Sequence, residues 1–151
     1  MSTFTNNWQL IRDFYKLAEP EIMAEKSNEW GLDPYFWDAG LVRMTPIESW
    51  LWHDLRAVDV VVYPQYPVSG FFVDFANPKA KVAIECDGED YHLDKAKDAA
   101  RDKKLRDAGW HVYRISGKDC RDGVDSEEPS KSAARSFVKH IAFMHNIQRN
   151  Q

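Results

Sequence analysis

Apolar side chains recur at helical spacing near the start of the chain. This spacing predicts a helix that ends near Ala18, formed by Trp8, Leu10, Ile11, Phe14, Tyr15 and Leu17. Proline cannot continue a helix ladder, so Pro20 is expected to start a second helix that runs to about Trp30, before Gly31. Residues 1–44 are therefore expected to form a helical, aromatic-rich extension that packs on the rest of the chain.

The clearest helix start in the sequence lies at Thr45. Thr45 is a suitable N-cap, Pro46 suits the first turn, and Glu48 completes a capping box. An apolar face follows at helical spacing, made of Ile47, Trp50, Leu51, Leu55 and Val58. We expect this helix to end near Ala57 or Val58.

Three strand-like runs come next. Residues 60–63 are mostly β-branched, and residues 65–68 continue them as an irregular strand that flanking prolines favour at a sheet edge. Residues 71–76 and 82–87 are two further apolar runs, separated by Asn77-Pro78-Lys79. Their spacing predicts a β-hairpin.

Both arms of this hairpin carry acids. Because side chains alternate along a strand, Asp74 is expected on the face opposite Val73 and Phe75, while Glu85 and Asp87 share one face of the second arm. Pairing of the arms would bring the three carboxylates together. Such a cluster is unfavourable in an apolar sheet unless a cation binds it, and a divalent cation prefers carboxylate oxygens.

The last third of the chain alternates between helix and strand. We expect a helix over residues 93–108, stopped by Gly109, and a fourth strand over 110–115 that runs parallel to the third. Residues 117–129 are expected to form a polar loop, with a terminal helix from Ser130 onward. Its predicted buried stripe is Ala134, Phe137, Val138, Ile141, Ala142 and Met144.

The predicted order is helix, three-strand meander, helix, strand and helix. This order indicates an α/β protein with a mixed four-stranded sheet flanked by helices. With 151 residues, of which 44% are hydrophobic, the chain is long enough for one compact core. Residues 45–151 are expected to form that core, and residues 1–44 the helical extension.

Composition excludes several classes of protein. No apolar run has the length of a membrane span, and the N-terminus lacks the pattern of a signal peptide. The two cysteines, Cys86 and Cys120, have no CxxC spacing, which disfavours a zinc site or disulfide framework and favours a reducing cytoplasm. A net charge of −4 argues against binding nucleic acid through overall charge, but not against a local basic patch.

Taken together, the motifs from Thr45 to about Arg121 resemble the PD-(D/E)xK nuclease superfamily. Within it, the chain is most similar to small domains like the very-short-patch-repair endonuclease. The resemblance covers about half of the chain and implies a restriction-endonuclease-like core. It rests on the order of Thr45-Pro46-Ile47-Glu48, Gln65, Val73-Asp74-Phe75, Ile84-Glu85-Cys86-Asp87-Gly88, His92, Arg101-Asp102, Leu105 and residues 109–114.

This resemblance implies cleavage of DNA phosphodiester bonds with Mg²⁺ or Mn²⁺. Carried over by position, Glu48, Asp74 and Glu85 would hold the metal, with the backbone carbonyl of Cys86 as a further ligand. One departure concerns Asp87, which stands where the superfamily usually has a lysine that orients or deprotonates the attacking water. The close relatives also lack this lysine, so its loss does not by itself indicate a dead enzyme.

Other residues are candidates for the lysine's work and for DNA contact. His92, with an ordinary pKa of about 6.5, suits proton transfer. Lys97, Arg101 and Lys104 form a basic stripe at helical spacing that could reach phosphates, and Arg114 could enter the same cleft. Gln65 is a further candidate for DNA contact.

Each candidate also has a structural interpretation. Glu48 could serve only the capping box, Asp87 could simply form a turn, and Gln65 could be an ordinary edge-strand residue. Arg114 could pair with an acid. The basic stripe could be a solvated face whose members pair with Asp94, Asp98 and Asp102.

The leading hypothesis is thus a metal-dependent DNA endonuclease or nickase. The alternatives are a catalytically inactive nuclease-fold module that binds nucleic acid or a protein, and a metallohydrolase acting on another phosphoester. Because no separate DNA-binding domain is visible, a homodimer or a partner protein is expected to contribute targeting.

Overall fold

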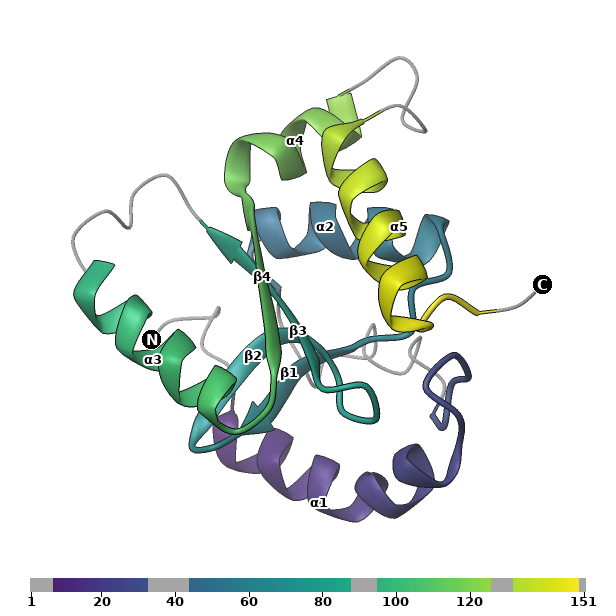
Figure 1. Ribbon diagram of the computed structural model, residues 1–151, viewed down its shortest axis with the longest axis vertical. Helices are drawn as coiled ribbons and strands as arrows, with labels where there is room; N and C mark the ends of the chain where they lie inside the picture. The colour runs from purple at the N-terminus through teal and green to yellow at the C-terminus, as the bar shows by residue number, and fades with distance from the viewer. Residues whose placement is uncertain (1–6, 33–43, 88–94, 126–131, 150–151) are drawn as a thin grey trace.

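The computed structural model describes residues 7–32, 44–87, 95–125 and 132–149, with side chains described except at Lys95 and residues 122–125. Figure 1 shows the arrangement of its helices and strands. In chain order these are α1 (Trp8–Ala24), α2 (Pro46–Ala57), β1 (Tyr63–Val68), β2 (Phe71–Asn77), β3 (Val82–Asp87), α3 (Lys95–Asp107), β4 (His111–Ser116), α4 (Gly117–Asp125) and α5 (Ala133–His145).

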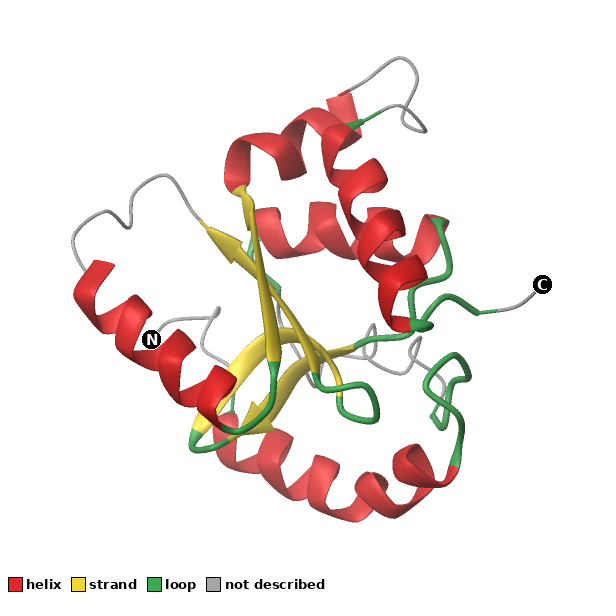
Figure 2. Ribbon diagram, in the orientation of Figure 1, coloured by secondary structure: helices red, strands yellow, loops and turns green. Residues whose placement is uncertain are grey.

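The four strands form one mixed sheet in the order β1-β2-β3-β4. The pairs β1–β2 and β2–β3 are antiparallel, and β3 and β4 are parallel. A parallel pair needs a crossover connection, which α3 provides. The predicted α/β class, the meander and the mixed sheet flanked by helices are confirmed (Figure 2).

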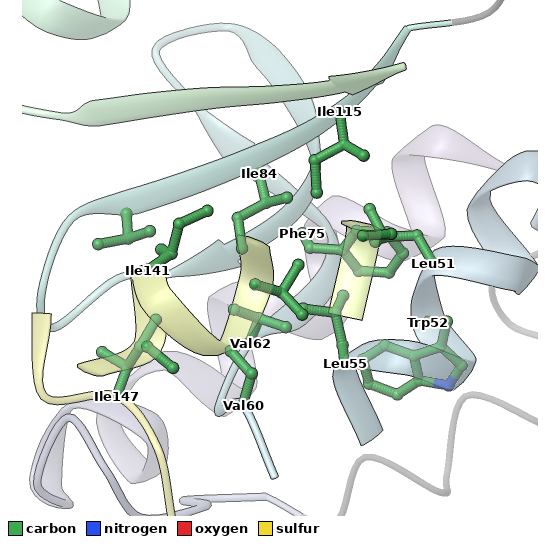
Figure 3. Packing of buried hydrophobic residues seen from close by; sticks show 14 of the residues in the cluster. Leu51, Trp52, Leu55, Val60, Val62, Phe75, Ile84, Ile115, Ile141 and Ile147 are labelled. Atoms are coloured by element: carbon green, nitrogen blue, oxygen red, sulfur yellow. The ribbon is translucent and has the colours of Figure 1, made fainter. Parts of the chain in front are cut away.

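The helices cover the two faces of the sheet with two apolar clusters. One cluster joins α1 to the sheet and to Leu105 of α3, through Ile11, Tyr15, Ile22, Tyr63 and Ala83 among others. The other joins α2, α4 and α5 to the opposite face. In Figure 3, Phe75, Ile84 and Ile115 of the sheet lie together with Leu51 and Leu55 of α2 and Ile141 of α5.

The helix α2 follows its predicted bounds. Thr45 is the N-cap, its side chain accepts a hydrogen bond from Glu48 N, and Glu48 closes the capping box from the other side. The helix ends at Ala57 with Val58 as the C-cap. The local sequence is therefore sufficient to set both ends of this helix.

The prediction of a helix break at Pro20 was wrong. α1 continues through Pro20, which lies exposed on the outer side of the helix. The buried positions Ile11, Tyr15, Ala18 and Ile22 keep one face in contact with the sheet on both sides of the proline. Tertiary packing outweighs the lost backbone hydrogen bond, so the local helix-breaking signal does not decide the outcome.

The prediction of a loop over residues 117–129 was wrong for residues 117–125, which form α4, and its remaining residues lie outside the described part of the chain. The hydroxyl of Ser116 accepts a hydrogen bond from Asp119 N at 3.1 Å and so supports the start of the helix. Cys120 is fully buried against α2 and α5. The glycine and the polar sequence predicted a loop, whereas burial of Cys120 against α2 and α5 favours a helix.

Three smaller expectations need correction. Val60 and Val62 precede β1 and belong to the core, where Val60 pairs with Gln148 of the C-terminal segment. In α5, Phe137 and Met144 are 40% and 50% exposed, so the buried stripe is narrower than predicted. Val73 and Phe75 belong to different apolar clusters, so the alternation expected along β2 does not hold across Asp74.

Two exclusions can be compared with the structure. Within the described residues, no helix is long and apolar enough to cross a membrane. Both cysteines are free thiols.

Gly117 allows α4, α2 and β3 to approach closely. A Cβ at this position would lie 2.9 Å from Ile47 Cδ1 and 3.2 Å from the carbonyl oxygen of Asp87. We therefore expect Gly117→Ala to lower the free energy of unfolding by about 1–3 kcal/mol, measured by urea denaturation. Combining it with Ile47→Val, which removes the closer atom, should restore part of the loss, and a Gly117→Ala protein as stable as the wild type would contradict this account.

Candidate active site

Two carboxylates replace the backbone ladder where β2 and β3 separate. The ladder pairs Phe75–Asn77 with Val82–Ile84 and stops there. Beyond it, Glu85 Oε2 accepts a hydrogen bond from Asp74 N at 3.2 Å, and Asp74 Oδ2 accepts one from Cys86 N at 2.8 Å. Each acid thus satisfies a backbone donor that the ladder leaves unpaired. We call Asp74 and Glu85 the acid pair.

The acid pair titrates abnormally. Burial, and then the charge of Glu85, raise the pKa of Asp74 well above its ordinary value. Burial also raises the pKa of Glu85, against the opposing charge of Arg101. A half-buried carboxyl group beside a buried one resists full ionisation, which is the electrostatic condition that a bound cation would relieve.

A cleft of about 640 Å³ opens beside the acid pair. The strands β2, β3 and β4 and the helix α3 that surround it are labelled in Figure 1. Its lining combines acids at the sheet end with a basic helix face: Phe71, Asp74, Glu85, Cys86, Asp87, Lys97, Asp98, Ala100, Arg101, Lys104 and Arg114. The predicted basic stripe therefore faces the acid pair, and Phe71 is a lining residue that the sequence did not single out.

Arg101 connects the helix face to the acid pair. Its Nη2 donates to Glu85 Oε1 at 2.7 Å and to the carbonyl oxygen of Phe72 at 2.6 Å. The guanidinium also lies over the ring of Phe71, 5.4 Å from the ring centre. The predicted reach of Arg101 into the cleft is thus directed first at a carboxylate.

The sequence analysis expects Asp87 to join the other two acids, but its carboxylate binds elsewhere. Its carboxylate accepts a hydrogen bond from Arg114 Nη1 at 2.6 Å, and Asp102 takes the other side of the same guanidinium through two hydrogen bonds. β3 and β4 are parallel with Glu85 beside Arg114, which brings Arg114 within reach of Asp87. The hydrogen bond to Asp102 raises the pKa of Arg114.

Asp102 supports the site through Arg114 rather than through the basic stripe. It was considered as a partner of the basic stripe, but it is 8% exposed and binds Arg114. Its position directly after Arg101 puts it on a different side of α3, toward β4. The signal was available in the helical spacing, since neighbouring residues on a helix do not share a face.

Glu48 lies behind the acid pair with both carboxylate oxygens occupied. Oε1 accepts hydrogen bonds from Thr45 N and Thr45 Oγ1, and Oε2 accepts one from Gln65 Nε2. Burial and the charge of Asp74 raise the pKa of Glu48. The side chain has not turned away from Thr45, so the capping interpretation holds, while its role as a metal ligand stays a prediction.

Gln65 is buried, with 4% exposure, and has a left-handed backbone with φ of 52°. Its neighbours Pro64 and Tyr66 pair with Phe75 and Val73, so Gln65 lies across from Asp74. Its amide orients Glu48 in this structure. Direct contact of Gln65 with DNA stays a prediction.

Two further predictions concern this site. His92, the candidate for proton transfer, lies outside the described residues. Among the residues that are described, no group of three or more His, Cys, Asp and Glu side chains is arranged to hold a metal ion. The acid pair fits a hard divalent cation by its chemistry, because two neighbouring carboxylates with raised pKa values line the cleft.

The sequence profile of the REase_MTES_1575 family matches residues 48–127, more than half of the chain. The protein belongs to this restriction endonuclease-like family. The match contains the acid pair, all four strands and the helix α3. The REase_MTES_1575 assignment confirms the predicted superfamily-level resemblance, but not the narrower likeness to very-short-patch-repair endonucleases.

A relative in Escherichia coli (strain K12), the uncharacterized protein YcjD, is 36% identical over 75 residues. The aligned region covers 48% of this chain and 64% of that protein. The catalytic domain of the homing endonuclease I-Bth0305I has a similar structure, with a TM-score of 0.53 and 23% identity over 68% of this chain and 98% of that domain. This likeness establishes an endonuclease-like fold.

The raised pKa of Asp74 has a consequence for stability. An acid whose pKa in the folded state lies above its ordinary value of 3.8 stabilises the fold when protonated. That contribution is complete below the ordinary value and is lost as the pH rises through the folded-state pKa. We therefore expect Asp74→Asn to raise the free energy of unfolding at pH 7 by about 0.5–2 kcal/mol in metal-free buffer.

Thermal unfolding of wild type and Asp74→Asn between pH 4 and pH 8, in a chelator, measures this effect. The advantage of the variant should shrink toward low pH, where Asp74 is already protonated in the wild type. The matched control is Asp13→Asn on the exposed side of α1, which should change stability by less than about 0.5 kcal/mol. An Asp74→Asn protein less stable than wild type at pH 7 would show that ionised Asp74 does not destabilise the fold.

Proposed function

We propose that the protein is a divalent-metal-dependent endonuclease or nickase that hydrolyses DNA phosphodiester bonds. The observation that carries this proposal is the acid pair, in which buried Glu85 and half-buried Asp74, both with raised pKa values, lie together at a cleft whose α3 side is basic. Strongly perturbed acids in a cleft are typical of catalytic sites. Membership of a restriction endonuclease-like family supports the same class of reaction.

In this proposal the residues of the chain have distinct roles. Asp74 and Glu85 hold Mg²⁺ or Mn²⁺, with the carbonyl of Cys86 and the carboxylate of Glu48 as further candidate ligands. The bound ion supplies Lewis-acid activation of the phosphate and a water molecule of lowered pKa. Lys97 and Lys104 bind the phosphates of the DNA from the α3 side of the cleft, and His92 is the candidate proton carrier.

The inactive-module alternative predicts a different balance of charge. A scaffold without catalytic function has no reason to keep Asp74 beside Glu85, since replacing Asp74 would relieve repulsion. The acid pair therefore favours an enzyme. DNA is favoured over other phosphoesters because Lys97 and Lys104, seven residues apart on α3, both line the cleft and could bind successive phosphates.

The narrower predictions stay proposals. A repair role of the very-short-patch type, and assembly as a homodimer or with a targeting protein, are consistent with one catalytic domain of this size. Cleavage at a defined DNA site by the isolated monomer would contradict the need for a targeting partner.

Cleavage of supercoiled plasmid with Mg²⁺ or Mn²⁺ tests the main proposal. Asp74→Ala and Glu85→Ala should each lower the cleavage rate by at least about 100-fold, because metal binding contributes several kcal/mol to the transition state. Arg106→Gln, an exposed change on α3 outside the cleft, is the control and should keep the wild-type rate. Cleavage that persists in a chelator or in Glu85→Ala would overturn the proposal, as would no cleavage by folded protein with either metal.

The lysines of α3 allow a matched comparison. Lys97 and Lys104 line the cleft, whereas Lys103 is exposed on the same helix and pairs with Asp107 at 2.7 Å. Lys97→Gln and Lys104→Gln should weaken DNA binding and each reduce the slope of log Kd against log salt by about one. Lys103→Gln should leave both quantities unchanged in a fluorescence anisotropy titration, and equal weakening by all three changes would indicate non-specific attraction.

A further inference from the structure

Arg101 occupies the acid pair in the way a cation would. Its Nη2 lies 2.7 Å from Glu85 Oε1, and the two side chains are 25% and 3% exposed. A buried carboxylate requires a positive partner, and in the metal-free protein the guanidinium provides it. Arg101 and a metal ion on Glu85 therefore compete for the same oxygen.

Arg101 has fewer carboxylate partners than Arg114, the other arginine that lines the cleft. Arg114 is bound by Asp102 on one side and Asp87 on the other. Among the described residues, Arg101 donates hydrogen bonds to one carboxylate and one backbone carbonyl, and its buried Nε has no hydrogen-bond partner. A buried donor without a hydrogen-bond partner is unfavourable, so this position holds the guanidinium incompletely.

The cleft offers Arg101 a second position. Its side chain lines the cleft together with Lys97 and Lys104, which lie one turn before it and one turn after it on the same face of α3. A phosphate bound by these lysines would present oxygens that a guanidinium can bind through two parallel hydrogen bonds. The same side chain can thus neutralise Glu85 without metal and a phosphate with metal.

We propose that Arg101 is a positioning residue that acts as an internal counter-cation for the acid pair. It binds Glu85 in the metal-free protein, gives up that carboxylate when a divalent ion binds, and then binds the DNA phosphate. The inference rests on the proposed nuclease function. It links metal binding to substrate binding, because the ion releases the guanidinium that the phosphate needs.

The proposal gives Arg101→Gln two opposite effects. Without the competing guanidinium, Mn²⁺ should bind more tightly, by about tenfold, which lies within the usual range of coupling between two ligands. The same variant should raise the KM for DNA, because one phosphate contact is lost. A purely structural role would weaken both, so tighter metal binding is the diagnostic result.

Calorimetric titration of metal-free protein with Mn²⁺ measures the first effect. Wild type, Arg101→Gln and the exposed control Arg106→Gln are compared, and Arg106→Gln should match the wild type. In the background of Glu85→Gln, the change at residue 101 should no longer alter Mn²⁺ affinity. If Arg101→Gln does not fold, Arg101→Lys replaces it; lysine keeps the charge without the planar fork, and Mn²⁺ should bind this variant more tightly than it binds the wild type.

The outcomes separate this inference from the nuclease proposal. Wild-type Mn²⁺ binding that depends on Asp74 and Glu85, with equal or weaker binding in Arg101→Gln, overturns the role of Arg101 and leaves the nuclease proposal intact. Absence of Mn²⁺ and Mg²⁺ binding in every variant overturns both. Tighter Mn²⁺ binding together with a raised KM supports both.

Discussion

The candidate site depends on the point where the β2–β3 ladder stops. An antiparallel pair that continued past Phe75 and Ile84 would satisfy its own backbone donors and leave Asp74 and Glu85 without a structural role. Because the strands separate, each carboxylate instead accepts a backbone N–H from the opposite strand. The acids are thus fixed by hydrogen bonds to the main chain, which is the most rigid support available, and the cleft opens directly beside them.

Positive side chains from α3 and β4 balance the charge of two acids in this cleft. α3 contributes Arg101 to Glu85, and β4 contributes Arg114 to Asp87. No such partner takes the carboxylate of Asp74 among the described residues, and its pKa is the one raised well above the ordinary value. The acid without a positive partner is therefore Asp74, which lies where β2 and β3 separate. A protein under selection for stability alone would remove it, so its presence is an argument for function.

The sequence predicted those parts of the fold that local signals determine. The Thr45 capping box predicted the start of α2, and the hairpin and the crossover predicted the sheet order. α1 and α4 were predicted wrongly because burial of Ile22 beyond Pro20, and of Cys120 after Gly117, outweighs local propensity. For the site, the predicted pairing of the two hairpin arms correctly brought Asp74 and Glu85 together, although the expected alternation fails across Asp74. It could not show that Asp87 pairs with Arg114, since that contact depends on the parallel register of β3 and β4.

The position of Asp87 also explains how the site can lack the superfamily's lysine. A lysine there would place a positive charge on β3, next to the acid pair. In this chain two arginines bring positive charge to the same region from outside β3, Arg101 from α3 and Arg114 from β4. The charge near the acids is therefore kept although the motif has lost it. A guanidinium stays protonated at any physiological pH, so these residues can position a phosphate or a carboxylate but cannot remove a proton from water. In the proposed nuclease, the electrostatic and the proton-transfer work of the missing lysine would accordingly fall to different groups.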